Sequence, residues 1–219
     1  MGVLYLFDID GTLLHAHGSG RDAFDAVFAE QYGIANASTG ISYGGKTDPG
    51  IVDEIFAKHL QRKATAGELA AFLDAYLPRL RALLATQGVK VLAGVVEALE
   101  YLNGRALLGV ATGNVRAGAE AKLAAARLEA WFECGGYGCD SALRAELVAR
   151  AIERGRERRE VQEVVVVGDT VHDIAAARAC RATVCAVATG SDPVDRLRDA
   201  DAVFASMTEL PAWHAQRFG

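Results

Sequence analysis

Four short apolar segments constrain the fold of this chain more than any other feature of its sequence. They occupy residues 3–9, 106–111, 164–167 and 182–188, and each is followed by polar turn residues with a glycine and then by a helical pattern. Short apolar runs bounded by turn residues are typical of strands that are buried on both faces. Because these strands alternate with helices, the sequence predicts a parallel α/β sheet.

Helical patterns, with apolar residues three and four positions apart, fill the intervals between the strands. They cover residues 21–32, 49–60, 66–84, 97–102, 115–128, 144–158 and 172–181. The interval from 15 to 88 contains no second buried strand, so we expect a helical insert placed directly after the first strand. Residues 40–50 are its most loop-like part.

The composition indicates an ordinary globular protein and argues against two classes of partner. Hydrophobic residues make up 51% of the 219 residues and charged residues 23%, as in a folded domain. The formal net charge of -5 disfavours nucleic acids and anionic membranes, which favour clustered Lys and Arg. The N-terminal segment does not resemble a signal peptide and is too short to span a bilayer. We therefore expect a cytoplasmic protein with reduced cysteines and with neither nucleic acid nor membrane as a partner.

Two pairs of aspartates follow two of the apolar segments. Asp8 and Asp10 lie at the end of the first one, and Asp169 and Asp173 follow the third. Carboxylates that share a small volume repel one another unless a cation or a proton is present. Hard oxygen ligands of this kind suit Mg²⁺, which is the cofactor we expect.

Other candidate residues follow the second strand and lie in the insert. Thr112, Gly113 and Asn114 close the strand and begin a helix, where a hydroxyl and backbone N–H groups can hold a phosphate. Lys46, in the Gly-rich loop of the insert, is a candidate for binding a carboxylate of the substrate, and Arg21 is a second candidate. A solvated charge explains Lys46 equally well.

Three strings in the chain resemble the motifs of the haloacid dehalogenase superfamily, in its phosphoglycolate-phosphatase-like branch. FDIDGTLL at 7–14 resembles the first motif, ATGN at 111–114 the second, and VVVVGDTVHDI at 164–174 the fourth. The third motif is a basic residue ahead of the fourth-motif strand. We assign it to Arg144, while Lys122, Arg150 and Arg154 lie in the same part of the chain.

The resemblance implies a Rossmann-like core domain at 1–14 and 89–219 and a small helical cap domain at 15–88. It implies that Asp8 attacks phosphorus and that Asp10 is the general acid and base. Thr112 and Arg144 would bind the transferring phosphoryl group. Asp8, the backbone carbonyl of Asp10 and Asp169 would bind Mg²⁺, with Asp173 orienting the metal shell. The first and fourth-motif strands would be neighbours, so that Asp8 and Asp169 meet where the strand order reverses.

The function that the resemblance implies is hydrolysis of a small phosphorylated metabolite, similar to phosphoglycolate, through an aspartyl-phosphate intermediate. A phosphomutase acting on a sugar phosphate also keeps both Asp8 and Asp10, so it is the second hypothesis. A binding module that has lost the reaction is a third hypothesis, which the presence of all the required acids argues against. The sequence indicates no particular oligomeric state.

Overall fold

The sheet predicted from the apolar segments is present in the computed structural model, which describes residues 2–219. Within these residues, six parallel strands pair in the order β5-β4-β1-β6-β7-β8. The strands are β1 (Val3–Phe7), β4 (Leu107–Ala111), β5 (Cys134–Gly136), β6 (Glu163–Gly168), β7 (Thr183–Val187) and β8 (Ala202–Phe204). The α/β fold with a Rossmann-like parallel sheet is therefore confirmed.

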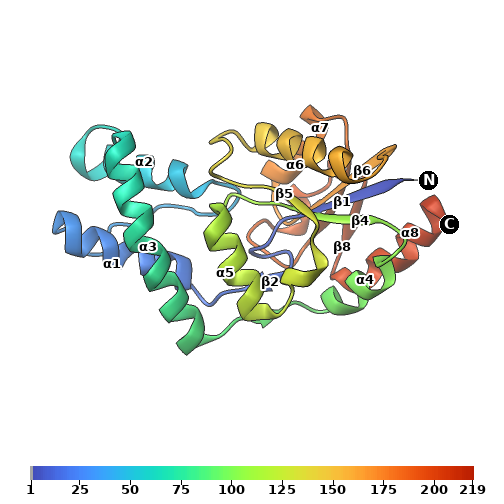
Figure 1. Cartoon of the computed structure of the whole chain (residues 1–219), viewed down its shortest axis with the longest axis horizontal. Coiled ribbons are helices and arrows are strands. Elements are labelled where there is room, and N and C mark those ends of the chain that lie inside the picture. The colour runs from blue at the N-terminus through green and yellow to red at the C-terminus, as the bar shows by residue number, and fades with distance from the viewer. Residues whose placement is uncertain (1) are drawn as a thin grey trace.

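The strand order reverses at β1, which lies between β4 and β6 in the middle of the sheet (Figure 1). Phe7 at the end of β1 is level with Val110 in β4 and with Val167 in β6. The residues that follow these three strands therefore emerge side by side at one edge of the sheet. In open parallel sheets this reversal is where ligands bind.

Helices cover both faces of the sheet, as the alternation of buried residues in β1 requires. They are α4 (Val95–Leu102), α5 (Arg116–Ala126), α6 (Arg144–Arg158), α7 (Val171–Ala179) and α8 (Leu210–Phe218). Leu4 and Leu6 pack in one apolar cluster with α6 and α7, while Tyr5 and Phe7 belong to a second cluster with α4, α5 and α8. Figure 1 shows α6 and α7 on one side of the sheet and α4, α5 and α8 on the other.

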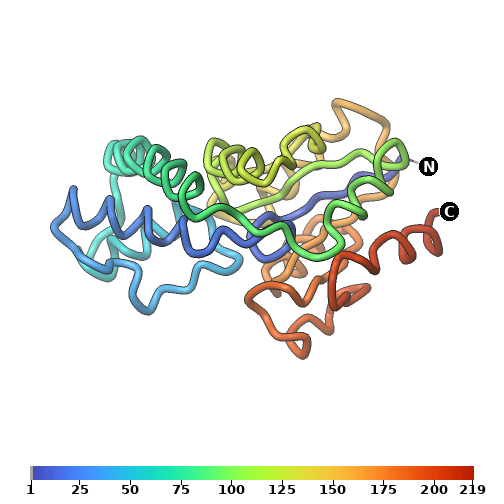
Figure 2. The backbone as a smooth tube through the Cα atoms, turned by 90° about the horizontal axis from the view of Figure 1, so that it is seen from below, coloured from blue at the N-terminus to red at the C-terminus, as the bar shows by residue number. Residues whose placement is uncertain are grey.

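Three further helices lie together at the end of the molecule opposite the two termini (Figure 2). They are α1 (Ser19–Tyr32), α2 (Asp48–Leu60) and α3 (Ala66–Gln87). Their shared interior is aromatic, since Phe24 lies within 5 Å of the ring centroids of both Phe72 and Tyr76, at 4.9 and 4.8 Å. We keep the name cap for α1–α3 and their loops, and its status as a separate domain, with boundaries at 15 and 88, stays a prediction.

The chain enters and leaves the cap through two short strands that pair with each other. β2 (Leu14–His15) and β3 (Lys90–Val91) form an antiparallel ladder of two residue pairs. The cap also packs on the sheet domain through α3, which contacts α5. No helix within residues 2–219 combines the length and the apolar character needed to cross a lipid bilayer.

Candidate active site

Asp8 is the first residue after β1, and its backbone ties it to the neighbouring strand. Its N–H donates to the carbonyl oxygen of Val167 in β6 at 2.9 Å. The chain then turns sharply at Gly11, which has a φ of +83°. A Cβ at this position would lie 2.7 Å from Oδ2 of Asp169, so only glycine fits both the backbone conformation and the space. Gly11 thus allows the loop after β1 to pass directly over the loop after β6.

Three buried carboxylates gather at this edge of the sheet. Oxygen atoms of Asp8, Asp169 and Asp173 all lie within 4.8 Å of one another. This confirms the expectation that Asp8 and Asp169 meet where the strand order reverses. The side chain of Asp10 lies outside this group.

Hydrogen bonds fix the orientation of two members of the carboxylate group. Asp169 accepts from the Thr12 hydroxyl at 3.2 Å and from the Ser191 backbone N–H at 2.9 Å. Asp173 accepts from the hydroxyl of Thr170 at 2.7 Å and is part of the capping box that begins α7. The capping interaction that begins α7 therefore also positions the Asp173 carboxylate.

The charges in this group are unbalanced. The guanidinium of Arg144, at the start of α6, lies 2.6 Å from Asp173 and 3.1 Å from Asp8. Burial raises the pKa of Asp8 to about 6 even though Arg144 opposes the change. Burial, together with the charges of Asp8 and Asp173, raises the pKa of Asp169 to about 7. One arginine thus faces three acids, and oxygen donors of this number and hardness fit a divalent cation such as Mg²⁺.

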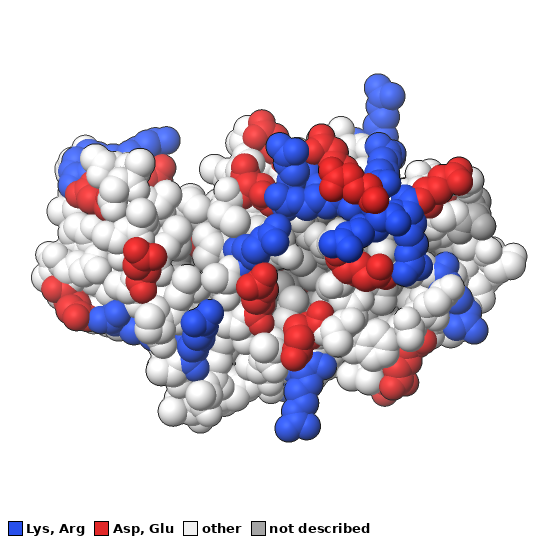
Figure 3. All heavy atoms as spheres, viewed as in Figure 1, with Lys and Arg blue, Asp and Glu red and all other residues white. Residues whose placement is uncertain are grey.

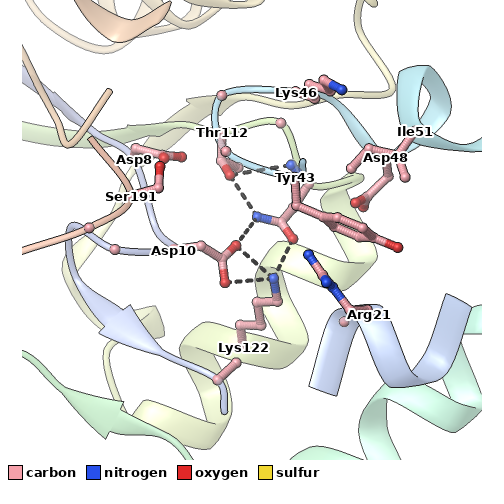
Figure 4. A pocket seen from close by; sticks show the side chains of 18 of the residues that line it. Asp8, Asp10, Arg21, Tyr43, Lys46, Asp48, Ile51, Thr112, Lys122 and Ser191 are labelled. Atoms are coloured by element: carbon pink, nitrogen blue, oxygen red, sulfur yellow. Dashed lines mark hydrogen bonds and ion pairs between the residues drawn. The ribbon is translucent and has the colours of Figure 1, made fainter. Parts of the chain in front are cut away.

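Asp10 lines the same pocket as Asp8 but faces different partners (Figure 4). Both of its carboxylate oxygens accept from Nζ of Lys122, at 2.8 and 2.6 Å. The amide of Asn114 donates to Asp10 at 2.7 Å. Burial alone would raise the pKa of Asp10, but the contacts with Lys122 and Asn114 hold it below the usual range. Asp10 is therefore held as an ionised carboxylate beside the site.

Lys122 is a site residue that the sequence indicates only as one of several basic residues near the third motif. It lies on α5, its side chain is 6% exposed, and its ammonium also donates to Oδ1 of Asn114 at 2.7 Å. A lysine on the buried face of an Ala-rich helix is the signal that could have identified it, since lysine is rarely buried without a partner. Arg150 and Arg154, from the same part of the chain, pair instead with Glu153 and Asp140. Both lie on α6, over which basic side chains gather in Figure 3.

Thr112 is fully buried at the end of β4, where its N–H donates to Gly136 O in β5 at 3.0 Å. Its hydroxyl oxygen accepts from the Asn114 amide at 2.8 Å. The residue that caps α5 is Val115, so Thr112 is not an ordinary helix cap. The hydroxyl proton of Thr112 is thus available to a ligand in the pocket.

The turn after Thr112 is where the cap meets the sheet domain. The backbone N–H of Asp48 in the cap donates to Gly113 O at 2.8 Å, and the Asp48 carboxylate accepts from the Val115 N–H at 2.8 Å. A Cβ at Gly113 would lie only 1.9 Å from the carbonyl oxygen of Lys46, so the two backbones touch here. The second motif and the cap loop therefore form one continuous wall.

Between the sheet edge and the cap lies a pocket of about 720 Å³. It is lined by Asp8, Asp10, Thr112, Gly113, Asn114, Arg144 and Asp169, and by Lys46 among the cap residues. The side chain of Lys46 points away from Asp10 in Figure 4, and its ammonium pairs with Glu54. The structure thus brings the sheet-domain candidates together, whereas the ammonium of Lys46 is bound elsewhere.

Comparisons with solved structures and with protein-family models give matches, whereas the comparison with curated proteins gives none. CbbY from Rhodobacter sphaeroides, in a complex with phosphate, is 20% identical over 96% of each chain, with a TM-score of 0.76. A predicted phosphatase from Clostridium acetobutylicum is 17% identical over 99% of each chain, with a TM-score of 0.73. A protein provisionally named β-phosphoglucomutase, from Bacteroides vulgatus, is 16% identical, with a TM-score of 0.70, over 98% of this chain and 88% of its own.

At these identities the solved structures share the fold with this chain. The stronger finding comes from a protein-family model, which matches residues 4–181 and therefore includes the loops that carry Asp8, Thr112, Arg144 and Asp169. On this match, the chain belongs to the haloacid dehalogenase-like hydrolases.

Proposed function

We propose that this hydrolase is a Mg²⁺-dependent phosphatase that cleaves a small phosphorylated metabolite through an aspartyl-phosphate on Asp8. The observation that carries the proposal is the convergence of Asp8, Asp169 and Asp173 within 4.8 Å at the strand-order reversal, beside Asp10 and Thr112. Family membership supports the enzyme class, and the site chemistry supports the residue roles.

In the first step, an oxygen of Asp8 forms a bond to phosphorus while the bond from phosphorus to the ester oxygen breaks. Asp10 is ionised in the free site, so the proton that it gives to the leaving oxygen has to arrive with the substrate, bound as the monoanion of its phosphate ester. In the second step, Asp10 takes a proton from a water molecule that attacks the same phosphorus, which releases phosphate and restores Asp8. Thr112 and Arg144 bind the phosphoryl oxygens, and the contact of Arg144 with Asp8 supports this placement.

Lys122, Asn114 and Gly113 have supporting roles in this proposal. Lys122 and Asn114 hold the Asp10 carboxylate through their hydrogen bonds to it. Gly113 allows the cap loop to approach the second motif. Lys46, the cap residue proposed from the sequence, would have to leave Glu54 in order to bind a substrate.

The metal would be held by Asp8, Asp169 and the backbone carbonyl of Asp10, with Asp173 orienting the shell. When bound, Mg²⁺ neutralises charge on the phosphoryl group and on the carboxylates. The excess of acid over base in the buried group supports this assignment.

The substrate is the finer part of the proposal. The resemblance to the phosphoglycolate-phosphatase-like branch favours a metabolite similar to phosphoglycolate, acted on in the cytoplasm. CbbY has also been solved with xylulose-(1,5)bisphosphate, in a structure that is 20% identical to this chain with a TM-score of 0.75. Substrates with more than one phosphate are therefore worth including in any test.

The proposal is tested by phosphate release from p-nitrophenyl phosphate, with and without Mg²⁺, for the parent and for Asp8→Asn. We expect release to require the metal and to fall by about a thousandfold or more in Asp8→Asn, because the amide cannot attack phosphorus. Asp199→Asn, an exposed acid outside the pocket, is the matched control and should hydrolyse like the parent. Equal activity of the parent and Asp8→Asn would remove Asp8 from the role of nucleophile.

A phosphomutase is the second candidate, favoured by the presence of both Asp8 and Asp10. Incubation with a sugar 1-phosphate separates the two functions, since a mutase returns an isomeric sugar phosphate and a phosphatase returns free phosphate. A chain that neither hydrolyses nor isomerises any of these compounds would fit the binding module instead.

A further inference from the structure

The pocket has a second end that the proposed phosphoryl chemistry does not use. This end is formed by the cap, with Arg21 and Phe24 from α1, Tyr43 from the loop before α2, and Ile51 from α2. In Figure 4 the guanidinium of Arg21 points into the pocket from the side opposite Asp8. A group bound there would lie on the substrate at a distance from the phosphoryl group.

Arg21 differs in its pairing from Lys122, Arg144 and Lys46, whereas Lys90, an exposed residue of β3 that also lines the pocket, is likewise without an ion pair in the described part of the chain. Lys122 lies 2.6 Å from Asp10, Arg144 lies 2.6 Å from Asp173, and Lys46 pairs with Glu54. Within residues 2–219, no carboxylate lies within ion-pairing distance of the Arg21 guanidinium. Its positive charge is therefore available to a ligand.

The guanidinium is held in place by contacts that leave most of its N–H groups unused. One Nη atom donates to the carbonyl oxygen of Ile41 at 3.3 Å, and the group stacks 4.9 Å from the ring centroid of Tyr43. Tyr43 is itself fixed, by a 2.6 Å hydrogen bond with the Ser38 hydroxyl and by edge contact with Phe24. A planar fork of donors held in this way matches the oxygens of a carboxylate or a phosphate.

The wall between the two ends carries hydrogen-bond acceptors. Asp48 is buried there, with one oxygen bound to the Val115 N–H and its carboxylate lining the pocket. A fixed carboxylate repels an anion but accepts hydrogen bonds from hydroxyl groups. The volume of about 720 Å³ also exceeds what the two-carbon skeleton of phosphoglycolate can fill.

We propose that Arg21 determines specificity by binding a second anionic group of the substrate, across a hydroxylated chain from the phosphoryl group. The substrate class is then a sugar bisphosphate or a phosphorylated sugar acid. This inference rests on the proposed phosphatase function and names its substrate class.

The experiment compares kcat/KM for four phosphate esters in the parent, Arg21→Ala, Arg21→Lys and Arg81→Ala. The esters are fructose 1,6-bisphosphate, 6-phosphogluconate, glucose 6-phosphate and p-nitrophenyl phosphate. The first two carry a second phosphate or a carboxylate, and the last two carry no second anion. Arg81 lies exposed on α3 outside the pocket, so Arg81→Ala is the matched control.

We expect the parent to prefer at least one doubly anionic ester, and Arg21→Ala to lose about ten- to a hundredfold in kcat/KM for it, mainly through KM. The loss for p-nitrophenyl phosphate should be at least tenfold smaller. Arg21→Lys should recover part of the loss, since it restores the charge without the planar fork. Whichever of the two doubly anionic esters shows the effect identifies the second group as phosphate or carboxylate.

Equal losses for all four esters in Arg21→Ala, or no loss for any, would overturn the assignment of Arg21. A parent that prefers glucose 6-phosphate over both doubly anionic esters would also overturn it. The failure of the phosphatase proposal is a different outcome, namely that Asp8→Asn releases phosphate from p-nitrophenyl phosphate as fast as the parent.

Discussion

Lys122 is the buried cation that joins the second motif to the proposed acid and base. Its ammonium contacts both oxygens of Asp10 and the side chain of Asn114. We expect Lys122→Met to lower kcat by about a hundredfold or more with a smaller change in KM, because Asp10 loses the contact that positions it. Steady-state kinetics with p-nitrophenyl phosphate measure both constants.

Two further variants serve as controls for Lys122→Met. Lys63→Met removes a lysine whose side chain is 82% exposed, and its kinetics should match those of the parent. Lys122→Arg should recover part of kcat, since it keeps a cation beside Asp10. If Lys122→Met changed KM alone, the lysine would be a substrate contact and not a positioning residue.

Asp48 provides a pH-dependent contribution to stability. Burial raises its pKa to about 6 despite the attraction of Lys122 and the hydrogen bond from Val115, and Asp10 adds to the rise. Because the folded state binds the proton more tightly than the unfolded state, stability falls as pH rises from about 4 to about 6 and is then level. The largest change expected is about 3 kcal/mol.

Asp48→Asn tests this contribution, because asparagine keeps the acceptor for the Val115 N–H but does not ionise. Urea unfolding at pH 4 and pH 7, in EDTA, gives the free energy of unfolding for both proteins. We expect the variant to gain stability relative to the parent between these two pH values. A difference that does not change with pH would show that Asp48 titrates alike in the folded and unfolded chain.

The residues of the site differ in how far their sequence context reveals them. Asp8, Thr112 and Asp169 directly follow apolar strands, and parallel strands place such residues at one edge of the sheet. Lys122 lies well inside α5, so its position depends on the rotation of that helix about its axis. Sequence spacing gives that rotation only when a clear apolar stripe defines the buried face, and α5 is Ala-rich on several sides.

At the scale of the element, the length and composition of a strand decide whether the sequence predicts it. The apolar segments predict β1, β4, β6 and β7 within about two residues, because each strand consists mainly of buried apolar residues. No pattern predicts β5, since its sequence CGG has two glycines and no β-branched residue. β8 has three residues, and β2 and β3 have two each, which is too short to show a period. Tertiary pairing forms these strands, and local sequence does not encode it.

The loop between α1 and α2 lies directly against the loop after β7, and a disulfide can cross-link the two loops. A Cβ built at Gly44 would lie 3.3 Å from the Cβ of Ser191, close to the spacing within a disulfide. Cys139 is an exposed free thiol, so it is replaced by serine to prevent wrong pairing. We expect the oxidised double variant Gly44→Cys and Ser191→Cys, made with Cys139→Ser, to lose most of its turnover of sugar phosphates. Dithiothreitol should restore activity, because the cap must move for substrates to enter and leave.

The single variants Gly44→Cys and Ser191→Cys, in the same Cys139→Ser background, separate the cross-link from the substitutions. Each should respond to dithiothreitol no more than the parent. Full turnover by the cross-linked enzyme would mean that substrates reach Asp8 without movement of this loop.

At the scale of the whole molecule, the metal site couples binding to folding. Three buried acids face one arginine, so a divalent cation should bind the folded chain far better than the unfolded one. At Mg²⁺ a hundred times above Kd, the stabilisation is about 2.7 kcal/mol, which raises Tm by roughly 5–10 °C for a chain of this size. Thermal unfolding in Mg²⁺ and in EDTA measures the shift.

Asp169→Asn should reduce this Mg²⁺-dependent shift strongly, whereas Asp199→Asn should keep it. Asp169→Asn should also unfold no earlier than the parent in EDTA, since it removes one of the repelling charges. A shift that survives intact in Asp169→Asn would place the bound cation elsewhere on the protein.

The β2–β3 ladder restricts how the cap can travel. A cap joined by one flexible linker could rotate in any direction. Here the chain that enters the cap and the chain that leaves it are paired, at Leu14 with Val91 and at His15 with Lys90. Because the two crossings are paired, they hold the cap at two adjacent points, which prevents rotation about the axis of a single chain. Any movement of the cap should therefore be a rotation about one hinge at this ladder. Each closure should return Arg21 to the same place across the pocket from the carboxylates.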